Sequence, residues 1–553
     1  MIKIQKALLC FLFLTILTGC AKKMDDQTLK LRIGGEPSVI NPILSTDSAS
    51  SSIESLIFNG LMKVNPDLEI VPDLAKSYKI SPDGKTYTFY LRTDVHWHNG
   101  VKFTAQDVKF TFDKILEKTT NTVRRSNFII DGEPIQFKVV NNYIIQAVLP
   151  KPFAPFLTRM TMGILPEHLL KEKDINTSEF NRIPIGTGPF EFVTWKTGHY
   201  IYLKRNSKYF DKTPKLEGIL IKMIPDSNTA LVALKRGEID LATIPSHAFR
   251  SYKFDPSIRV FHYPDLSYSY MGLNLKNPFL ADKKVRQALA HAINKKILIQ
   301  NVLKGLGTIA YLPTSPLLWA YPKDAHEIYE YNPEKSKQLL SKAGFVRDKR
   351  TNILHKNGKP FEFTLITNKG NKDREKIAQI IQRYLQEIGI KMNIQVMEWS
   401  SFVRLLNSPK DPKPFDAALL AWSLSLDPDS YSIWHSSQYP NGFNLVGYKN
   451  AKVDKLLEKG RLEMDQTSRA RIYKSLFTKI AKDVPYVFLF YPEAIVATHR
   501  RVKGLSKPGP AGMLNPIENV YLLQEKTAGE SKLEKQIREA EEQAKAKIPS
   551  PSK

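Results

Sequence analysis

Apolar side chains recur along the chain at two spacings, one typical of strands and one typical of helices. In residues 361–367 (FEFTLIT) apolar and polar side chains alternate, which predicts a half-buried strand. In residues 373–389 the apolar side chains fall on one helical face, and Gly389 closes the pattern. Alternation returns in residues 390–397. Strand, helix and strand in this order predict a parallel pair of strands joined by a right-handed crossover.

Other segments extend this picture. Residues 219–243 repeat the order of strand, helix and strand. Residues 281–305 predict one long helix, and residues 332–344 predict another that Asn332 caps. Residues 56–150 are richer in strand patterns. We therefore predict an α/β protein, with a more strand-rich segment near its start.

The first helix of that strand-rich segment has a clear start signal. Thr104 and Asp107 occupy the two positions of a capping box, in which each side chain accepts a hydrogen bond from the other residue's backbone N–H. This motif predicts that a helix over residues 104–116 begins directly after Thr104.

The N-terminus has the features of an export signal. Lys3 and Lys6 precede a short apolar stretch that ends at Gly19-Cys20. The stretch is shorter than the ~20 residues of a membrane-spanning helix. Residues 17–20 (LTGC) resemble the bacterial lipobox, in which the cysteine is lipidated and becomes the first mature residue. We therefore expect a signal peptide at 1–19, lipidation at Cys20, a tether at 20–28, and an exported, membrane-anchored protein. The alternative is an ordinary signal peptide with a chance cysteine.

Composition narrows the setting further. The chain has a net charge of +26 and only two cysteines, Cys10 and Cys20, so the mature part has no internal disulfide. Excess basic charge suggests an anionic neighbour. Because an exported lipoprotein rarely meets nucleic acid, we expect none as a partner, and an anionic envelope surface or acidic ligands fit better. A merely basic, solvated surface is the alternative.

The last residues differ from the rest. Residues 531–547 are polar helix formers with a thin apolar stripe that includes Ile537, and residues 548–553 resemble a disordered end. A lone charged helix of this length is marginal in water. We predict a solvated tail over residues 525–553, with contact to a partner as the alternative.

Motifs for catalysis and cofactors are missing from the sequence. There is no G-x-S-x-G, no phosphate-binding loop, no H-E-x-x-H and no paired-cysteine zinc site. We therefore expect no enzyme, no cofactor and no metal site. Scattered acids such as Glu36, Asp427 and Asp429 leave a hydrolase open as an alternative.

The chain also resembles a known protein family, and this resemblance is consistent with the observations above. Residues 55–112 resemble the oligopeptide/dipeptide/nickel class of solute-binding proteins, family 5, and further similar blocks follow in the same order up to "NLVGYKN" at 444–450. The resemblance covers roughly residues 29–523. It implies a two-lobed clamshell with an extra small domain and two hinge strands, near 268–274 and 483–487.

The resemblance also implies how the chain is divided. Lobe I is expected to be discontinuous, with the small extra domain inserted in it and the other main lobe following. The expected segments are 29–54, 183–267 and 487–524 for lobe I, 55–182 for the small domain, and 268–486 for lobe III.

The function that the resemblance implies is substrate capture for an ATP-driven importer. The ligand would be an oligopeptide or a peptide-containing wall fragment, and the partners an ABC permease and its ATPase subunits. We expect a monomer tied to the membrane by its lipid. The alternatives are a nickel or metal-chelate binder of the same fold and an adhesive or structural envelope lipoprotein.

The residues expected at the ligand follow from the family's ligand-facing segments. Trp422 matches a tryptophan at the cleft, and relatives that bind peptides place an aspartate three residues later to clamp the α-amino group. Ser425 occupies that position here, so the clamp is either supplied by Asp427 or Asp429 or absent, and the spacing from Trp422 to Asp427 is similar to that of the nickel-binding branch. The full set of expected ligand-binding residues is Glu36, Tyr268, Tyr270, Asn274, Trp422, Ser423, Ser425, Asp427 and Asp429.

Overall fold

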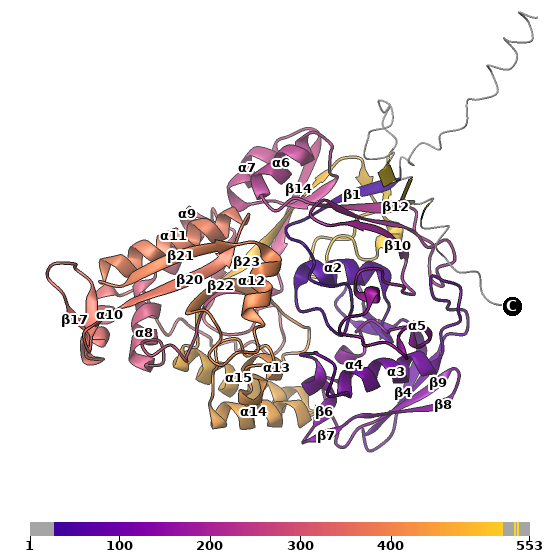
Figure 1. Ribbon diagram of the computed structural model, residues 1–553, viewed down its shortest axis with the longest axis horizontal. Coiled ribbons are helices and arrows are strands. Elements are labelled where there is room, and N and C mark those ends of the chain that lie inside the picture. The colour runs from indigo at the N-terminus through magenta and orange to yellow at the C-terminus, as the bar shows by residue number, and fades with distance from the viewer. Residues whose placement is uncertain (1–26, 524–535, 538, 541–542, 544–553) are drawn as a thin grey trace, which may run out of the picture.

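A twelve-stranded mixed sheet runs through the molecule and links its two lobes. The structure is a computed structural model that describes residues 27–523, 536–537, 539–540 and 543. The predicted signal peptide, Cys20 and most of the predicted tether lie outside these residues. In Figure 1 the strands β20 to β22 and their helices form one side of the molecule, and β1, β10 and β12 with the segment that carries α3 to α5 form the other.

The first lobe is built on one end of the sheet, where the strand order is β10-β11-β12-β1-β13. Strand β1 lies between β12 and β13 and is parallel to both. The strands and helices of this lobe are β1 (Thr28–Ile33), α2 (Ser48–Ile57), β10 (Phe190–Lys196), β11 (Tyr200–Arg205), β12 (Gly218–Met223), α6 (Ser227–Lys235), β13 (Leu241–Thr243), α7 (Phe249–Lys253), β14 (Ile258–Pro264), β24 (Val502–Lys503) and β25 (Tyr521–Leu522).

The small domain carries a separate antiparallel sheet of four strands in the order β4-β5-β9-β8. The predicted capping box of Thr104 and Asp107 is present at the start of α3 and is confirmed. The elements are β2 (Met62–Val64), β3 (Ile70–Pro72), β4 (Ala75–Ile80), β5 (Thr86–Leu91), α3 (Ala105–Leu116), η1 (Arg125–Phe128), β6 (Ile129–Ile130), β7 (Glu133–Pro134), β8 (Gln136–Asn141), β9 (Ile144–Val148), α4 (Phe156–Arg159) and α5 (Glu167–Leu170).

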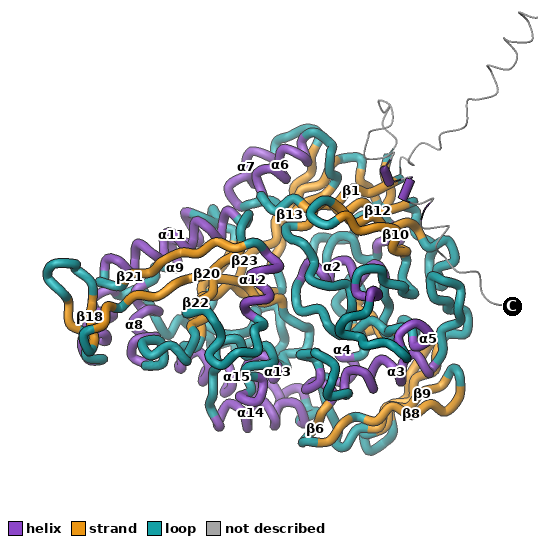
Figure 2. Tube along the Cα trace, viewed as in Figure 1, coloured by secondary structure: helices purple, strands orange, loops and turns teal. Residues whose placement is uncertain are grey.

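The second lobe holds the other end of the large sheet, in the order β23-β15-β22-β20-β21. Figure 2 shows α11 on one side of these strands and α14 and α15 on the other. The elements are β15 (Ser267–Leu273), α8 (Lys283–Ala292), α9 (Lys295–Asn301), β16 (Gly307–Ile309), α10 (Pro333–Lys342), β17 (Val346–Arg347), β18 (Leu354–Lys356), β19 (Lys359–Pro360), β20 (Glu362–Asn368), α11 (Lys372–Glu387), β21 (Lys391–Met397), α12 (Trp399–Leu406), β22 (Ala417–Ser423), α13 (Tyr431–Trp434), α14 (Ala451–Leu462), α15 (Gln466–Asp483) and β23 (Tyr486–His499).

Two of the predicted units differ in their outcome. Strands β20 and β21 pair in parallel around α11, as predicted. The single helix predicted over 281–305 is wrong, because the chain leaves helical geometry at Ile293 and Asn294 and starts α9 with Asn294 as its cap. The side chain of asparagine can accept hydrogen bonds from nearby backbone N–H groups, so asparagine is favoured at the start of a helix and disfavoured in its interior.

The hydrophobic cores of the molecule indicate which parts can move relative to one another. The sheet of the first lobe and the small domain share one core, which includes Leu29 of β1 and Phe89 and Phe112 of the small domain. The second lobe has two cores, one on each face of its sheet, which contain Met271 and Tyr270 respectively. Because packed cores resist deformation, we expect the first lobe and small domain to move as one body against the second lobe.

The connections between the lobes lie beside each other. Strand β23 pairs with β15 up to Phe490 and with β14 from Glu493 onward, and the second connection is the short segment between Pro264 and Ser267. All of β15 pairs with β22 inside the second lobe, and the hinge positions predicted at 268–274 and 483–487 lie within a few residues of these two crossings and stay predictions. We propose lobe boundaries at these two crossings, and the remaining predicted domain limits stay predictions.

The described part of the tail contacts the first lobe. Ile537 is buried against Tyr200, Tyr202 and Leu220, on the face of β11 and β12. At this residue the tail is packed rather than solvated, which differs from the expectation. Within the described part of the chain, no helix combines the length and apolarity needed to cross a bilayer.

Candidate functional site

The end of β22 opens into a cavity of about 150 Å³ between the lobes, which we call the inner cavity. Five of the nine residues expected at the ligand line it, and they come from β22 and the loop that follows. Arg159, at the end of α4, approaches from the small domain. The lining residues are Arg159, Pro313, Thr314, Leu318, Trp422, Ser423, Leu424, Ser425, Asp427, Pro428, Asp429, Ser430, Ser432, Ile433 and Phe443.

Trp422 is held in this wall by aromatic neighbours. Its Nε1 donates to the Tyr486 hydroxyl at 3.4 Å, and its ring meets Phe443 edge-on with 5.4 Å between centroids. Tyr270 lies behind it, stacked on Tyr486 at 4.0 Å. Trp422 is only partly buried and lines the inner cavity.

Tyr268 and Tyr270 point to the same face of β15, as their alternation predicts. Both side chains are nearly completely buried in the core of the second lobe, and neither lines the inner cavity. Burial raises the pKa of both hydroxyls well above the usual value, so they stay neutral. Tyr270 is stacked behind Trp422 with 6.3 Å between ring centroids, and Tyr268 packs against Tyr270.

Asp427 is occupied by an arginine of its own lobe. Arg469 binds both carboxylate oxygens, at 2.7 and 2.8 Å, and both side chains are less than 10% exposed. Such a fork-like pair is strong and geometrically specific. A ligand's α-amino group would have to displace Arg469 to reach this carboxylate.

Asp429 is fully buried and lies between two arginines from different parts of the molecule. Its Oδ2 accepts from Arg159 of the small domain at 2.6 Å and from Arg461 of α14 at 3.1 Å. Burial alone would raise the pKa of Asp429, but Arg461 and Arg159 outweigh burial, so the pKa lies below its ordinary value. The carboxylate is therefore ionised, and it joins the small domain to the second lobe.

The inner cavity retains unused hydrogen-bonding capacity. Among the residues that the structure describes, Thr314 Oγ1, Ser430 Oγ and Arg159 Nε are buried without a hydrogen-bond partner. A buried polar group without a partner costs about 1–3 kcal/mol. Two hydroxyls and a guanidinium N–H are thus available for the polar backbone of a ligand.

Glu36 and Asn274 have other partners, and neither lines the inner cavity. Glu36 accepts from Trp195 Nε1 at 2.6 Å and from the Gly198 amide at 2.8 Å, inside the first lobe. Asn274 donates to the backbone carbonyl of Phe415 at 2.6 Å and is buried at the end of β15. Their contacts hold the protein's own loops.

Further contacts join the two lobes. The Trp399 indole of α12 donates to Asp47 at 3.4 Å, and Asn407 donates to Thr46 at 2.9 Å. Gly35 lies against Trp399, and a Cβ at this glycine would come within 2.5 Å of the tryptophan side chain. The described structure is therefore a closed clamshell.

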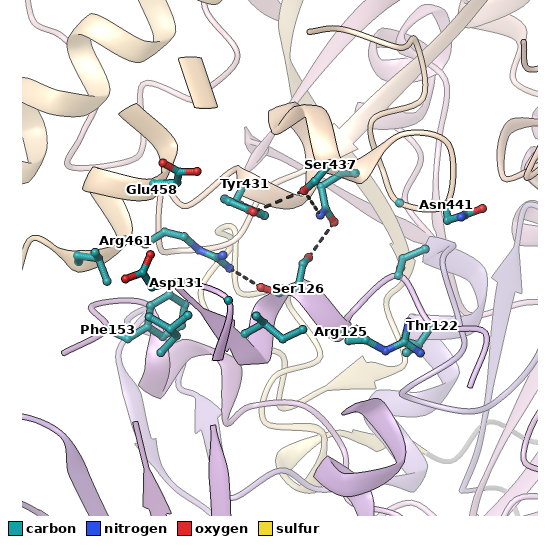
Figure 3. Close-up of a pocket in the computed structure, with 17 residues that line it drawn as sticks. Thr122, Arg125, Ser126, Asp131, Phe153, Tyr431, Ser437, Asn441, Glu458 and Arg461 are labelled. Carbon is teal, nitrogen blue, oxygen red and sulfur yellow. Dashed lines mark hydrogen bonds between the residues drawn. The ribbon is translucent and has the colours of Figure 1, made fainter. Parts of the chain in front are cut away.

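A second cavity, of about 430 Å³, lies between the small domain and α13 and α14; we call it the outer cavity. Figure 3 shows Arg461 reaching across it toward Ser126, whose backbone carbonyl accepts from Arg461 at 3.1 Å. Arg461 thus borders the outer cavity and also binds Asp429, which borders the inner one. No sequence motif marks Arg159 or Arg461, so neither residue was among those expected at the ligand.

Comparisons with known proteins agree with this architecture. The model of the bacterial extracellular solute-binding proteins, family 5 (Middle), matches residues 69–444. The chain belongs to this family. Solute-binding proteins of this family have the two-lobed fold described above, and the structural matches extend over nine-tenths of the chain.

Three relatives are informative about this solute-binding protein. The oligopeptide-binding protein AppA of Bacillus subtilis is 39% identical over 88% of this chain and 90% of its own length. The structure of that protein with a nonapeptide has a TM-score of 0.87 and covers 91% of this chain and all of the solved one. NikZ of Campylobacter jejuni with Ni(L-His) has a TM-score of 0.81 at 32% identity, covering 90% of this chain and all of NikZ. DppA of Helicobacter pylori with the peptide STSA also has a TM-score of 0.81, at 29% identity, covering 90% and 98%.

Proposed function

We propose that this protein captures oligopeptides between its lobes and delivers them to the permease of an ATP-driven importer. The observation that carries the proposal is the inner cavity, where Trp422 and unused polar groups from both lobes converge. The likeness to AppA, which was solved with a nonapeptide, supports a peptide as the ligand.

The mechanism is capture followed by hinge bending near Pro264–Ser267 and Phe490–Glu493. In the open form, a peptide would bind the second lobe beside Trp422 through its backbone. Hydrogen bonds to the peptide backbone do not depend on the side chains, so peptides of varied sequence could bind. Closure would then bring Arg159 and the small domain onto it. We propose binding without chemical change, so no cofactor takes part.

A metal chelate is the second candidate, because the spacing from Trp422 to Asp427 differs from that of typical peptide binders and NikZ was solved with Ni(L-His). Within the described residues, no group of three or more His, Cys, Asp or Glu side chains could hold a metal ion. A metal would therefore have to arrive already chelated. An adhesive lipoprotein and a hydrolase are the rivals from other classes.

We also propose that Cys20 carries a lipid that keeps the monomeric receptor near its permease, since tethering raises effective concentration. The excess of basic residues would suit an anionic envelope surface. Mass spectrometry of the mature N-terminus tests the lipid, and an unmodified Cys20 or a chain that begins elsewhere would contradict it.

Calorimetry with protein that was unfolded and refolded to remove bound ligand tests the main proposal. We expect saturable binding of one molecule from a random nonapeptide pool. Preferential binding of nickel–histidine would favour the chelate. Turnover of the titrated peptide would favour a hydrolase, and adhesion to envelope material without any saturable ligand would favour the adhesive.

A further inference from the structure

One edge of the large sheet lies at the end of the first lobe that is remote from the cleft. Strand β1 is parallel to its neighbours β12 and β13, β23 ends beside β13 at His499, and β14 starts opposite that residue. The start of β1 and the end of β23 therefore share one edge. At its other end β1 leads to Gly35, which meets Trp399 of the second lobe. Figure 1 shows α6, α7 and β1 at one end of the molecule and α14 and β8 at the other.

Gln27 fixes the point where the chain enters this edge. Its side chain donates to the backbone carbonyl of Leu522 at 2.8 Å and accepts from the Leu522 N–H at 3.0 Å, so the entry point is tied to β25. Gln27 follows Cys20 by seven residues, and seven residues span at most about 25 Å. A lipid on Cys20 therefore holds this edge within about 25 Å of the membrane surface.

Basic side chains gather beside the entry point. Arg500 donates its backbone N–H to Ser257 at 2.9 Å, and Arg259 donates to the carbonyl of Val502. Lys503 of β24 pairs with Tyr521 of β25, the strand to which Gln27 is tied. Because β1 and β14 are three strand spacings of ~4.8 Å apart, these residues lie within roughly 20 Å of the entry point. We call this surface the entry face, and its members are Lys235, Lys253, Phe254, Arg259, Arg500 and Lys503.

The positive charge of the entry face is largely unbalanced. Its acid is Asp255, whose pKa is lowered by hydrogen bonds from Ser257 and further by the nearby Lys235. Among the residues that the structure describes, none of the five basic residues of the face forms a salt bridge, so five cations and one acid give it a net charge of +4. The other acids of this edge have arginine partners of their own: Asp240 with Arg501, Glu238 with Arg236, and Glu217 with Arg205.

Phe254 adds an apolar group to these charges. Its side chain is 81% exposed, and Val232 on the neighbouring α6 is 48% exposed. The Tyr252 hydroxyl donates to the Leu231 carbonyl at 3.1 Å, which ties α7 to α6 and fixes the segment that carries the ring. An aromatic ring flanked by basic side chains suits the boundary of a bilayer, where the ring meets the acyl chains and the cations meet the phosphates.

We propose, on the basis of the lipid proposed above at Cys20, that the entry face lies against the anionic headgroups of the membrane, with Phe254 at the acyl boundary. The tether confines the face to the membrane, and its positive charge attracts it to the lipid within a Debye length of about 8–10 Å. Because the face lies at the end of the first lobe remote from the cleft, the cleft stays accessible to ligands. The contact thus sets the orientation of the receptor, which the tether alone leaves free.

Sedimentation with vesicles tests this contact without the lipid anchor. The protein is the mature chain with Cys20→Ser, and the vesicles are phosphatidylcholine alone or mixed with phosphatidylglycerol. Because each basic residue near an anionic surface contributes roughly fivefold in affinity, we expect Lys253→Gln combined with Arg500→Gln to weaken binding to the anionic vesicles about tenfold to thirtyfold. The matched control is Lys138→Gln combined with Lys455→Gln, which removes the same charge at exposed positions of the small domain and the second lobe. It should weaken binding less than about threefold, since these charges lie away from the lipid.

A fluorescent label reports the orientation on the same vesicles. Nitrobenzoxadiazole at Ser251→Cys, an exposed position on α7, should brighten and shift to shorter wavelength on anionic vesicles, whereas the same label at Lys138→Cys should not. Equal weakening by the two double variants, or an equal response of the two labels, would overturn the proposal. Absence of binding to the phosphatidylglycerol vesicles would overturn it as well, and would point to a protein as the partner of this face.

The outcomes for the proposed function are separate. No peptide enters the vesicle test, so peptide capture can fail while the entry face binds lipid, and the reverse. An unmodified Cys20 in the mass spectrum would contradict the tether, and it is measured independently of the vesicles.

Discussion

Asp429 offers the sharpest test of how the closed form is held together. Substitution by asparagine keeps the shape and removes the charge, which leaves Arg159 and Arg461 facing each other with no carboxylate between them. The side chain of Asp429 is 0% exposed, that of Arg159 is 15% exposed and that of Arg461 is 6% exposed. Removing one partner of a buried ion pair typically costs about 3–5 kcal/mol, because the remaining charge stays buried and uncompensated.

The structure divides this cost into two measurable parts. Arg461 and Asp429 belong to the same lobe, so their contact stabilises the second lobe, whereas the contact with Arg159 exists only when the lobes are closed. We expect Asp429→Asn to lower the free energy of urea unfolding and also to increase the radius of gyration in solution scattering. Arg159→Met should change the radius of gyration with little effect on the unfolding of the second lobe.

The matched control is Asp324→Asn, which breaks a surface pair with Lys474 whose side chains are more than half exposed. Exposed pairs contribute about 0–1 kcal/mol, so this variant should resemble wild type in both measurements. If Asp429→Asn were as stable and as compact as Asp324→Asn, the reasoning about a buried interlobe cluster would be refuted.

Three further predictions concern closure, the ligand and pH. Gly35→Ala should weaken peptide binding at least tenfold in calorimetry while leaving the melting temperature of the unliganded protein unchanged, because its Cβ would meet Trp399 only in the closed form; unchanged affinity would contradict this. Trp422→Ala should lower peptide affinity by about tenfold, equivalent to ~1.4 kcal/mol, whereas a lower melting temperature with unchanged affinity would show a purely structural role. Burial raises the pKa of Glu54 from 4.5 to about 7, despite Arg124 nearby. The native state therefore holds this proton more tightly than the unfolded state, and the stability that it contributes is present below about pH 4.5 and lost as the pH rises through about 7. Glu54→Gln should accordingly gain up to about 3 kcal/mol relative to wild type between pH 5 and 8 in urea unfolding, and parallel pH profiles would contradict the assignment.

Sequence patterns correctly predicted those local structures that depend only on neighbouring residues. The capping box at Thr104 and the parallel unit around α11 depend on nearby residues, and both are present. The helix predicted over 281–305 failed because Asn294 can cap a helix as well as continue one. The exact crossing point of β23 depends on pairing between strands more than 200 residues apart, for which a single sequence contains no local signal.

In the candidate site, too, the residues of one segment could be predicted from the sequence, whereas their partners from distant segments could not. Trp422, Ser423, Ser425, Asp427 and Asp429 belong to one segment, so one resemblance located them together, and all five line the inner cavity. The sequence could not reveal that Arg469 and Arg461 occupy the two aspartates, because those arginines lie on helices elsewhere in the chain. Arg159 comes from the opposite lobe, and only tertiary structure brings it to Asp429. Whether the expected residues bind a ligand stays a prediction.

Closure of the two lobes on a peptide is tested most directly by a distance measured across the cleft. The chain has no cysteine after Cys20, so in a chain with Cys10→Ser and Cys20→Ser the only spin labels would be at Lys138→Cys in the small domain and Lys455→Cys in the second lobe, both exposed positions. Pulsed electron paramagnetic resonance should give a longer, broader distance distribution without ligand and a shorter, narrower one with saturating nonapeptide pool. An identical distribution in both states, with calorimetry showing bound peptide, would contradict closure on the ligand.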